Sequence, residues 1–318
     1  MSIPCGEKEL VWYTQPVRLE STPAIVLRTR EYGESDKIVT VLSRAAGKFS
    51  GIAKGAMRSQ RRFPGTLELF SHVTLDFKRR PHSELAFLDR AVLLQPWPRL
   101  LSTLERFTAA SHVVELADKV TVESEVGDDL YAIVTSTLAR LNAAEPGPAT
   151  LRLFELAALH ASGYRPELVV CRGCAGPLAS DRGPVRLVGG IGGVLCSQCR
   201  GAEEGGMLLS NDGLACLGHL QDAVTRAGFA GGHDSSAGSS GGPDARVGFA
   251  NGRDAHGSAN GHEPHDPWAV EHAVAARLTS RVEREMALAL DMLLAPHLRG
   301  RLRSLELLGP VLNDRAGG

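Results

Sequence analysis

The sequence predicts an α+β protein of several domains, with an N-terminal β-barrel, an α-helical domain and a four-cysteine module inserted between helices. Three observations lead to this prediction. Short β-branched segments separated by turn residues come first, apolar residues at helical spacing follow, and two C-x-x-C pairs interrupt the helical pattern. With 318 residues, 43% of them hydrophobic, the chain is long enough for more than one core.

The barrel is expected over residues 23–97, after an irregular leader formed by residues 1–22, which show no periodicity. Its strands are "AIVLRTR", "IVTVLS", "FSGIAKG", "HVTLDF" and "ELAFLDRAVLL", and "EYGESDK" and "RAAGK" are turn sequences. In "HVTLDFK", Val73, Leu75 and Phe77 alternate with polar residues, which is the period of a strand with one buried face. Five short strands in a segment of this length indicate a small barrel or sandwich.

The helical domain is expected in two parts, residues 98–166 and residues 206–318. Its first helix has apolar residues at spacings of three and four: Leu100, Leu104, Phe107, Ala110, Val114 and Ala117. "DDLYAIVTSTLARLN", "ATLRLFELAALHASG" and "SNDGLACLGHLQDAVTRAG" predict three more helices. The last two are expected from Ala269 to Leu294 and over "LRSLELL".

Residues 228–267 interrupt the second helical part with a low-complexity sequence. Glycine, serine, asparagine and histidine dominate it, and these residues cannot build an apolar core. We expect a disordered insertion. Metal binding by its histidines is the alternative hypothesis.

The four-cysteine module is expected over residues 167–205. "CRGC" and "CSQC" each separate two cysteines by two residues, so that both thiolates of a pair can bind one ion. Two such pairs supply the four ligands of a structural zinc site, which has no open position for a substrate. A redox dithiol is the alternative. The predicted ligands of a single Zn²⁺ are Cys171, Cys174, Cys196 and Cys199.

Positive charge is concentrated in the predicted barrel, although the formal net charge of the chain is −1. Nine basic and two acidic residues lie between Arg44 and Arg80. A solvated surface usually mixes both signs, whereas a small barrel with a basic face is typical of oligonucleotide-binding proteins. The candidate DNA-binding residues are Lys48, Lys54, Arg58, Arg61, Arg62, Lys78, Arg79 and Arg80.

Alternatives remain for this basic surface. Lys48, Ser50 and Lys54 have the same parity and therefore share one strand face, but the stretch could still be an ordinary solvated hairpin. The segment "KRRP" could be only a basic hairpin tip. Phe63 could stack on a base or could close the end of the barrel.

The remaining features indicate a cytoplasmic protein that is not an enzyme. Glu7 and Glu9 lie where a signal peptide requires an apolar run, and Asp291 interrupts the longest apolar stretch, so no membrane contact is expected. The sequence has neither a G-x-x-x-x-G-K-[ST] phosphate loop nor an H-E-x-x-H motif.

These segments resemble a known family. "AIVLRTREYGESDKIVTVLSRAAGKFSGIAKGAMR" resembles the N-terminal signature of the bacterial recombination mediator RecO family, and "AKGAMR" matches its glycine-basic element. "CRGC…GGVLCSQC" matches the cysteine module, including Gly192 and Gly193. Two features depart from the family: the leader and the insertion have no counterpart, and Ala175 stands where glycine is common.

The resemblance implies an oligonucleotide-binding (OB) barrel, binding of single- and double-stranded DNA, annealing of complementary strands, and a nucleoid-associated location. It also implies two protein partners, RecR and the acidic tail of single-strand-binding protein. For that tail we expect a basic-rimmed groove on the helices, with Arg106, Arg140 and Arg152 as candidates. A zinc-ribbon RNA-binding or ribosome-associated factor is the alternative function, and a metal-dependent nuclease is a third.

Overall fold

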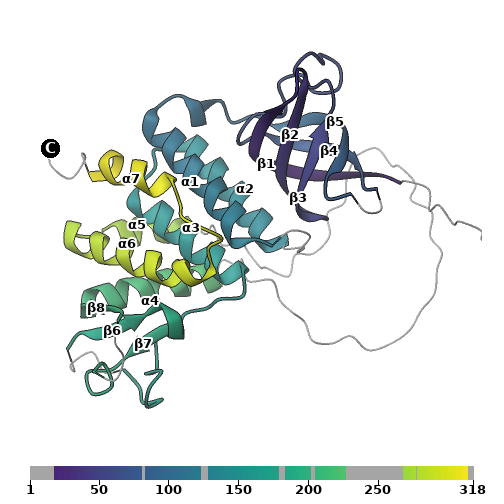
Figure 1. The fold of residues 1–318 in the computed structure, drawn as a ribbon. Helices are drawn as coiled ribbons and strands as arrows, with labels where there is room; N and C mark the ends of the chain where they lie inside the picture. The colour runs from purple at the N-terminus through teal and green to yellow at the C-terminus, as the bar shows by residue number, and fades with distance from the viewer. Residues whose placement is uncertain are drawn as a thin grey trace, which may run out of the picture. The chain divides into compact units, whose positions relative to one another are not determined.

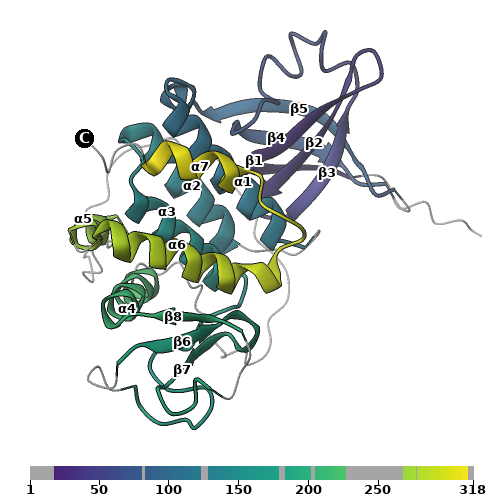
Figure 2. The ribbon, with the colours of Figure 1, turned by 60° about the vertical axis from the view of Figure 1, so that its left-hand side comes forward.

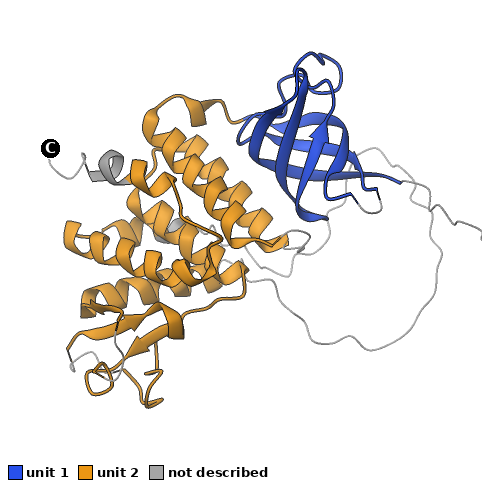
Figure 3. Ribbon diagram, viewed as in Figure 1, with its two compact units in different colours: residues 1–96 blue, residues 97–318 orange. Residues whose placement is uncertain are grey.

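The computed structural model describes residues 18–80, 83–122, 128–178, 183–201, 205–226, 268–276 and 278–313. The chain divides into two compact units, residues 1–96 and residues 97–318 (Figure 3). The insertion expected over residues 228–267 and most of the expected leader lie outside the described residues. None of the described helices is long and apolar enough to cross a membrane.

The first unit is a closed five-stranded barrel, as predicted (Figure 1). Its strands run in the order β1-β2-β3-β5-β4, in which β3 and β5 are parallel and the other neighbours are antiparallel. A five-stranded barrel with this order has the architecture of the OB fold. The strands are β1 (Leu19–Tyr32), β2 (Asp36–Ser43), β3 (Gly47–Ala53), β4 (His72–Lys78) and β5 (Ala86–Gln95).

The long strand β1 closes the barrel because it pairs with two neighbours. Its first half pairs with β4, starting at Leu19 opposite Lys78, and its second half pairs with β2 as far as Tyr32. A register shift between Val26 and Arg28 marks the bend between the halves. The strand therefore begins before the boundary predicted at residue 23, since its first residues are held by a partner far away in the sequence.

The interior of the barrel contains the inward-facing residues of every strand, including Val73, Leu75 and Phe77, so the alternation predicted for "HVTLDFK" is confirmed. Phe63 and Leu67, from the connection between β3 and β4, belong to the same core cluster. The other members are Ala24, Val26, Val39, Val41, Phe49, Ala53, Ala56, Ala86, Leu88 and Ala91.

The second unit is built around helix α3 (Pro148–Ala161), which contacts α1, α2, α4, α5 and α6 (Figures 1 and 2). Every residue from 149 to 159 is buried, as expected for a helix with neighbours on all sides. The surrounding helices are α1 (Leu104–Val120), α2 (Asp128–Ala143), α4 (Asn211–Arg226), α5 (Ala269–Ala275), α6 (Ser280–Leu294) and α7 (Ser304–Asn313). Short 3-10 turns lie at η1 (Pro98–Leu101), η3 (Gly189–Ile191) and η4 (Ala295–His297).

Two helical predictions were wrong in detail. The apolar stripe of the first helix included Leu104 and Phe107, but both are exposed, Leu104 to 65%. The helix predicted from Ala269 to Leu294 is two helices, because the Thr279 hydroxyl accepts a hydrogen bond from the Val282 N–H at 3.4 Å and caps α6.

The cysteine module adds a small sheet with the order β7-β6-β8 to this unit. Its strands are β6 (Val185–Val188), β7 (Gly193–Leu195) and β8 (Met207–Leu209). Strand β8 lies beyond the boundary predicted at residue 205, since it pairs with β6. The module is tied to α6 by Ser210, whose hydroxyl donates to the Glu285 carboxylate.

Strands β3 and β5 approach each other closely at Gly51, which pairs with Ala86. A Cβ atom at this position would lie 2.8 Å from Leu88 Cγ and 3.1 Å from the Ala86 carbonyl oxygen. We expect Gly51→Ala to lower the free energy of unfolding by about 1–3 kcal/mol, because the buried Leu88 side chain must move and the Ala86 carbonyl must give slightly. Urea unfolding followed by circular dichroism measures this loss.

The matched control is Gly218→Ala on α4, where a Cβ atom would meet no other atom within 4 Å. This change should leave the protein equally stable or stabilise it by up to about 1 kcal/mol, since alanine favours a helix. Equal effects of the two substitutions would contradict the close approach at Gly51.

Candidate metal centre and candidate nucleic-acid interface

The four predicted ligand cysteines come together at one point of the cysteine module. The sulfur atoms of Cys171, Cys174, Cys196 and Cys199 all lie within 4.8 Å of one another, and Cys174 Sγ is 4.0 Å from Cys196 Sγ. In a tetrahedral site with Zn–S bonds of about 2.3 Å, neighbouring sulfurs are about 3.8 Å apart. The four thiols therefore form a group that could hold a metal ion.

Backbone hydrogen bonds bring the two cysteine pairs together. The Arg172 N–H donates to the Val194 carbonyl at 2.9 Å, which joins the first pair to strand β7 just before Cys196. The N–H of Cys196 in turn points at Cys171 Sγ at 3.3 Å. Leu195 packs with Cys171 and Cys196 in a small core beneath the sulfurs. Apart from the sulfurs, this core is small, as the low apolar content of the segment predicts.

The peptide groups around the sulfurs favour thiolates. Burial opposes ionisation of Cys171, but N–H groups of Cys196, Cys174 and Gly173 outweigh it and lower the pKa of that thiol to about 6. N–H groups of Cys199 and Gln198 likewise lower the pKa of Cys196. The neighbouring sulfurs of Cys196 and Cys174 raise the pKa of Cys199 to about 12. Backbone dipoles thus stabilise part of the negative charge of a four-thiolate site, and a bound cation would stabilise the rest.

The candidate nucleic-acid interface is the basic loop, defined here as residues 54–62, which follows strand β3. Gly55 takes a positive φ of 66°, and its N–H donates to Asp36 Oδ1 at 2.7 Å. The Met57 N–H donates to the Ser35 carbonyl at 3.0 Å. The loop is therefore held against the turn between β1 and β2.

Arg62 has a structural role in this loop. Its guanidinium donates to the Lys54 carbonyl and lies 5.2 Å from the centroid of the Phe63 ring. Its backbone N–H donates to Ser59 Oγ at 3.2 Å, and its carbonyl accepts from the Ala91 N–H at 2.9 Å. These contacts close the loop on itself and attach it to β5.

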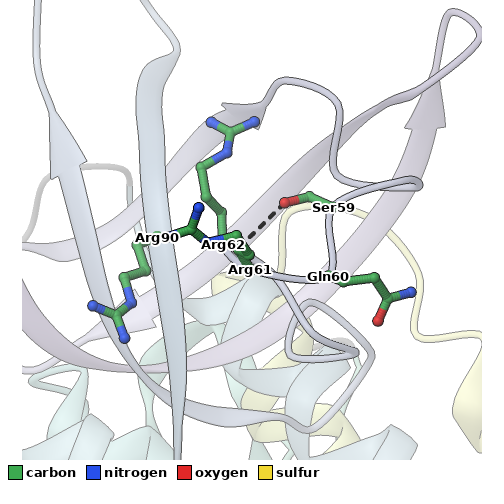
Figure 4. Close-up of a pocket in the computed structure, with 5 residues that line it drawn as sticks. All are labelled: Ser59, Gln60, Arg61, Arg62 and Arg90. Atoms are coloured by element: carbon green, nitrogen blue, oxygen red, sulfur yellow. Dashed lines mark hydrogen bonds between the residues drawn. The ribbon is translucent and has the colours of Figure 1, made fainter.

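Lys54, Arg58 and Arg61 are exposed in the same loop, and none of the three side chains forms an ion pair with a described residue. Arg61 and Arg62 also line an open pocket of about 710 Å³ together with Ser59, Gln60 and Arg90, which lies on β5 (Figure 4). No carboxylate is among these lining residues. The loop thus presents positive charge that is not neutralised by the described part of the chain.

Lys48 does not belong to this exposed group. It has the parity of Ser50 and Lys54, as predicted, but only 5% of it is exposed. Parity shows which face of a strand a residue occupies, and it does not show whether that face is covered. Including Lys48 in an exposed DNA-binding surface was therefore wrong.

The remaining candidates lie at the other end of the barrel. Strand β4 is antiparallel to β5 and β3 is parallel to it, so the residues that follow β4 and those that follow β3 are at opposite ends. Lys78, Arg79 and Arg80 come at the end of β4. Arg79 donates to the Ala46 carbonyl at 3.2 Å, and its guanidinium lies 5.1 Å from the Phe49 ring centroid. The structure thus separates the predicted basic residues into two groups.

The aromatic residue predicted to close the barrel or to stack on a base has the first role, because Phe63 is 4% exposed within the core cluster. The sequence reasoning did not identify Tyr32, which is exposed at the end of β1. It pairs with Asp36, the residue that holds Gly55, so it lies at the basic-loop end of the barrel. An exposed aromatic residue at a strand end beside the "EYGESDK" turn was the available signal.

The arginines expected to rim a groove on the helices are engaged within the second unit. Arg106 donates to the carbonyl groups at the end of α2 and pairs with Glu145 at 2.7 Å. Arg140 pairs with Glu271 at 2.8 Å, and Arg152 pairs with Glu155. Arg106 and Arg152 are buried. The three side chains therefore give no support to a basic groove for an acidic tail.

Two protein-family models match the chain, one over the first unit and the other over the first part of the second unit. The N-terminal model "Recombination protein O N terminal" matches residues 17–97, and "Recombination protein O C terminal" matches residues 101–230. The first match coincides with the barrel, and the second covers helices α1 to α4 with the cysteine module.

Curated proteins named "DNA repair protein RecO" are similar to the chain. The protein from Anaeromyxobacter sp. (strain K) is 38% identical over 198 residues, which cover 62% of this chain and 77% of the relative. The protein from Symbiobacterium thermophilum is 33% identical over 210 residues, or 65% and 82% of the two chains. The protein from Geobacter sulfurreducens is 33% identical over 184 residues, or 58% and 73%.

The cysteine module contains one backbone conformation that glycine would adopt more easily. Ala175, directly after Cys174, has a φ of 57°, and its N–H donates to the Cys171 carbonyl at 2.8 Å. In this left-handed backbone conformation a residue with a Cβ atom is destabilised by roughly 1–2 kcal/mol. Glycine removes this strain, but it also makes the unfolded chain more flexible, which cancels part of the gain. We expect Ala175→Gly to raise the free energy of unfolding by up to about 1 kcal/mol. Chemical denaturation of the purified protein measures the gain, and a lower stability would contradict it.

Proposed function

Because the chain belongs to the recombination protein O (RecO) family, we propose that it is a DNA-binding protein of recombinational DNA repair. In this role it anneals complementary single strands and, with RecR, helps to load recombinase onto DNA coated by single-strand-binding protein. These activities and both protein partners come from the family resemblance. The proposal requires no catalytic residues and assigns none.

The observation that carries the proposal is the basic loop at one end of an OB barrel. Lys54, Arg58 and Arg61 are exposed there without an acidic partner among the described residues. OB folds bind single strands with a positive surface that follows the phosphate backbone. The same hydrogen bonds that hold the loop, from Gly55 to Asp36 and from Met57 to Ser35, keep these charges at one place.

The predicted mode of binding is mainly electrostatic. Phe63 is buried and cannot stack on a base, which leaves Tyr32, among the residues that the structure describes, as an exposed aromatic side chain at the same end of the barrel as the basic loop. Binding through phosphates depends steeply on salt and little on sequence. We therefore expect affinity for any single strand of sufficient length. Competition of unlabelled RNA against bound DNA distinguishes this function from that of an RNA-binding factor.

We also propose that the four cysteines hold one structural Zn²⁺. Four thiolates select a soft metal ion and leave no coordination position open, so the ion would stabilise the module rather than react with a substrate. The module has a small core, and zinc binding contributes roughly 10–16 kcal/mol in peptides of this kind. Cys171, Cys174, Cys196 and Cys199 would be its ligands.

The DNA proposal predicts a change in the salt dependence of binding. Replacing Lys54, Arg58 and Arg61 by alanine should weaken the binding of single strands and reduce the slope of log affinity against log salt by up to about 2. Arg62 is left in place because it holds the loop. Fluorescence anisotropy at several salt concentrations, with unlabelled DNA and RNA as competitors, measures both effects, and annealing should decline in parallel.

The matched control replaces three arginines of the second unit by alanine: Arg226, Arg281 and Arg284. It changes the net charge equally and should leave the salt slope unchanged. If the two triple variants have superimposable titration curves, the basic loop is not the DNA-binding surface, and Lys78 and Arg80 at the other end of the barrel are next to be tested.

The zinc proposal predicts one zinc ion per chain, which Cys196→Ser should remove because three thiolates bind the ion much more weakly. The barrel should keep its structure, since it has its own core. Elemental analysis gives the metal content. Cys216→Ala is the control, because Cys216 is buried in α4 outside the four-sulfur group. Wild-type protein without zinc, or a Cys196→Ser variant with a full complement, would contradict the proposal.

A further inference from the structure

Arg90 is an exposed arginine that lies outside the basic stretch of the sequence. It lies on β5 opposite Asp76 of β4, but the Asp76 carboxylate accepts a hydrogen bond from the Ser21 hydroxyl at 2.6 Å. None of the ion pairs between described residues includes Arg90. Its guanidinium is therefore available to a ligand.

A β-bulge lies directly beside this side chain. The pairing of Asp76 with Arg90 is followed by that of Phe77 with Leu88, so β5 has one extra residue, Asp89, directly beside Arg90. Bulges redirect side chains, and they are common next to binding sites. Here the bulge lies where the basic loop is attached to β5, through the hydrogen bond between the Ala91 N–H and the Arg62 carbonyl.

Arg90 and the basic loop together form the pocket of about 710 Å³ (Figure 4). Arg62 is committed to the Lys54 carbonyl and the Phe63 ring, which leaves Arg61 and Arg90 with unused donors. The Ser59 hydroxyl accepts from the Arg62 N–H and keeps its own proton to donate, and the Gln60 amide is exposed. The pocket thus offers hydrogen-bond donors from two separate elements and no carboxylate.

We propose that this pocket holds one internal phosphodiester group of single-stranded DNA, together with its nucleoside, between Arg61 and Arg90. The inference rests on the proposed function and adds a residue and a preference for one strand form. The guanidinium fork of each arginine matches two phosphate oxygens, and the lining of the open pocket is polar and without a carboxylate, as an anionic ligand requires.

A single strand fits the pocket better than a duplex for a geometric reason. A flexible strand can turn one nucleotide into a concave site, whereas the phosphates of a duplex lie on a stiff, regular surface. The exposed side chains of Lys54 and Arg58, outside the pocket, can contact either form. Arg90 therefore contributes more to single-strand binding than to duplex binding.

The test compares Arg90→Ala and Arg90→Lys with the wild-type chain on a single strand and a duplex of equal length, neither carrying a terminal phosphate. Arg90→Ala should weaken single-strand binding about tenfold or more, as expected for loss of a hydrogen bond to a charged group, and duplex binding less. It should reduce the single-strand salt slope by about 0.7. Arg90→Lys keeps the charge and the slope but loses the fork, so affinity should still fall by about threefold to tenfold.

Arg226→Ala is the control for charge, and melting temperatures check that the Arg90 variants are folded. Wild-type affinity in both folded Arg90 variants would contradict the proposal that the pocket binds DNA. Equal losses of affinity for the single strand and the duplex would contradict the strand preference. A loss confined to strands with an added 5′-phosphate would assign the pocket to a terminal phosphate instead. A loss of affinity for an acidic peptide, with DNA binding intact, would make the pocket a protein site.

A different result would contradict the proposed function: the variant in which Lys54, Arg58 and Arg61 are replaced by alanine would bind DNA as tightly as the wild type. If that variant binds DNA more weakly while Arg90→Ala and Arg90→Lys bind as the wild type does, the basic loop remains the proposed DNA-binding surface and only the proposed role of the pocket is contradicted.

Discussion

Closure of the barrel by β1 is the constraint on which the candidate DNA-binding surface of the first unit depends. The strand pairs with β4 through its first half and with β2 through its second, and the register shift after Val26 lets it do both. Once the barrel is closed, the direction of every strand is determined. The residues after β3 and those after β4 then lie at opposite ends, which separates the basic loop from Lys78, Arg79 and Arg80.

The basic loop illustrates how a concentration of like charges is kept in one conformation. Mutual repulsion of Lys54, Arg58 and Arg61 opposes the fold weakly, because exposed charges are screened by water and salt. Backbone groups provide the compensation, through the bonds to Asp36, Ser35 and β5 and through the guanidinium of Arg62. Arg62 therefore supports the surface, while Lys54, Arg58 and Arg61 stay exposed and without an ion pair to a described residue.

The cysteine module combines a local and a distant requirement. Locally, N–H groups directed at Cys171 and Cys196 favour thiolates, and the sulfurs are close enough to share one ion. At a distance, Ser210 and Glu285 connect the sheet to α6, whose partner α3 lies at the centre of the helical unit. Metal binding would thus stabilise the module and, through α6, its attachment to the helices.

The sequence by itself determined features that depend on near neighbours in the chain. Two C-x-x-C pairs specify which four sulfurs come together, and the alternation of Val73, Leu75 and Phe77 specifies the buried face of a strand. The apolar run over residues 149–159 specifies a helix, but its central position depends on its neighbours. Tertiary structure decided what depends on partners far away in the sequence. In the folded chain Lys48 is buried, and Arg106 and Arg152 are buried within the helical unit. Arg90, next to a β-bulge, lies beside the basic loop. Whether a charged side chain is exposed or paired depends on the residues that surround it in the folded protein, and the spacing of residues along the sequence does not predict these neighbours.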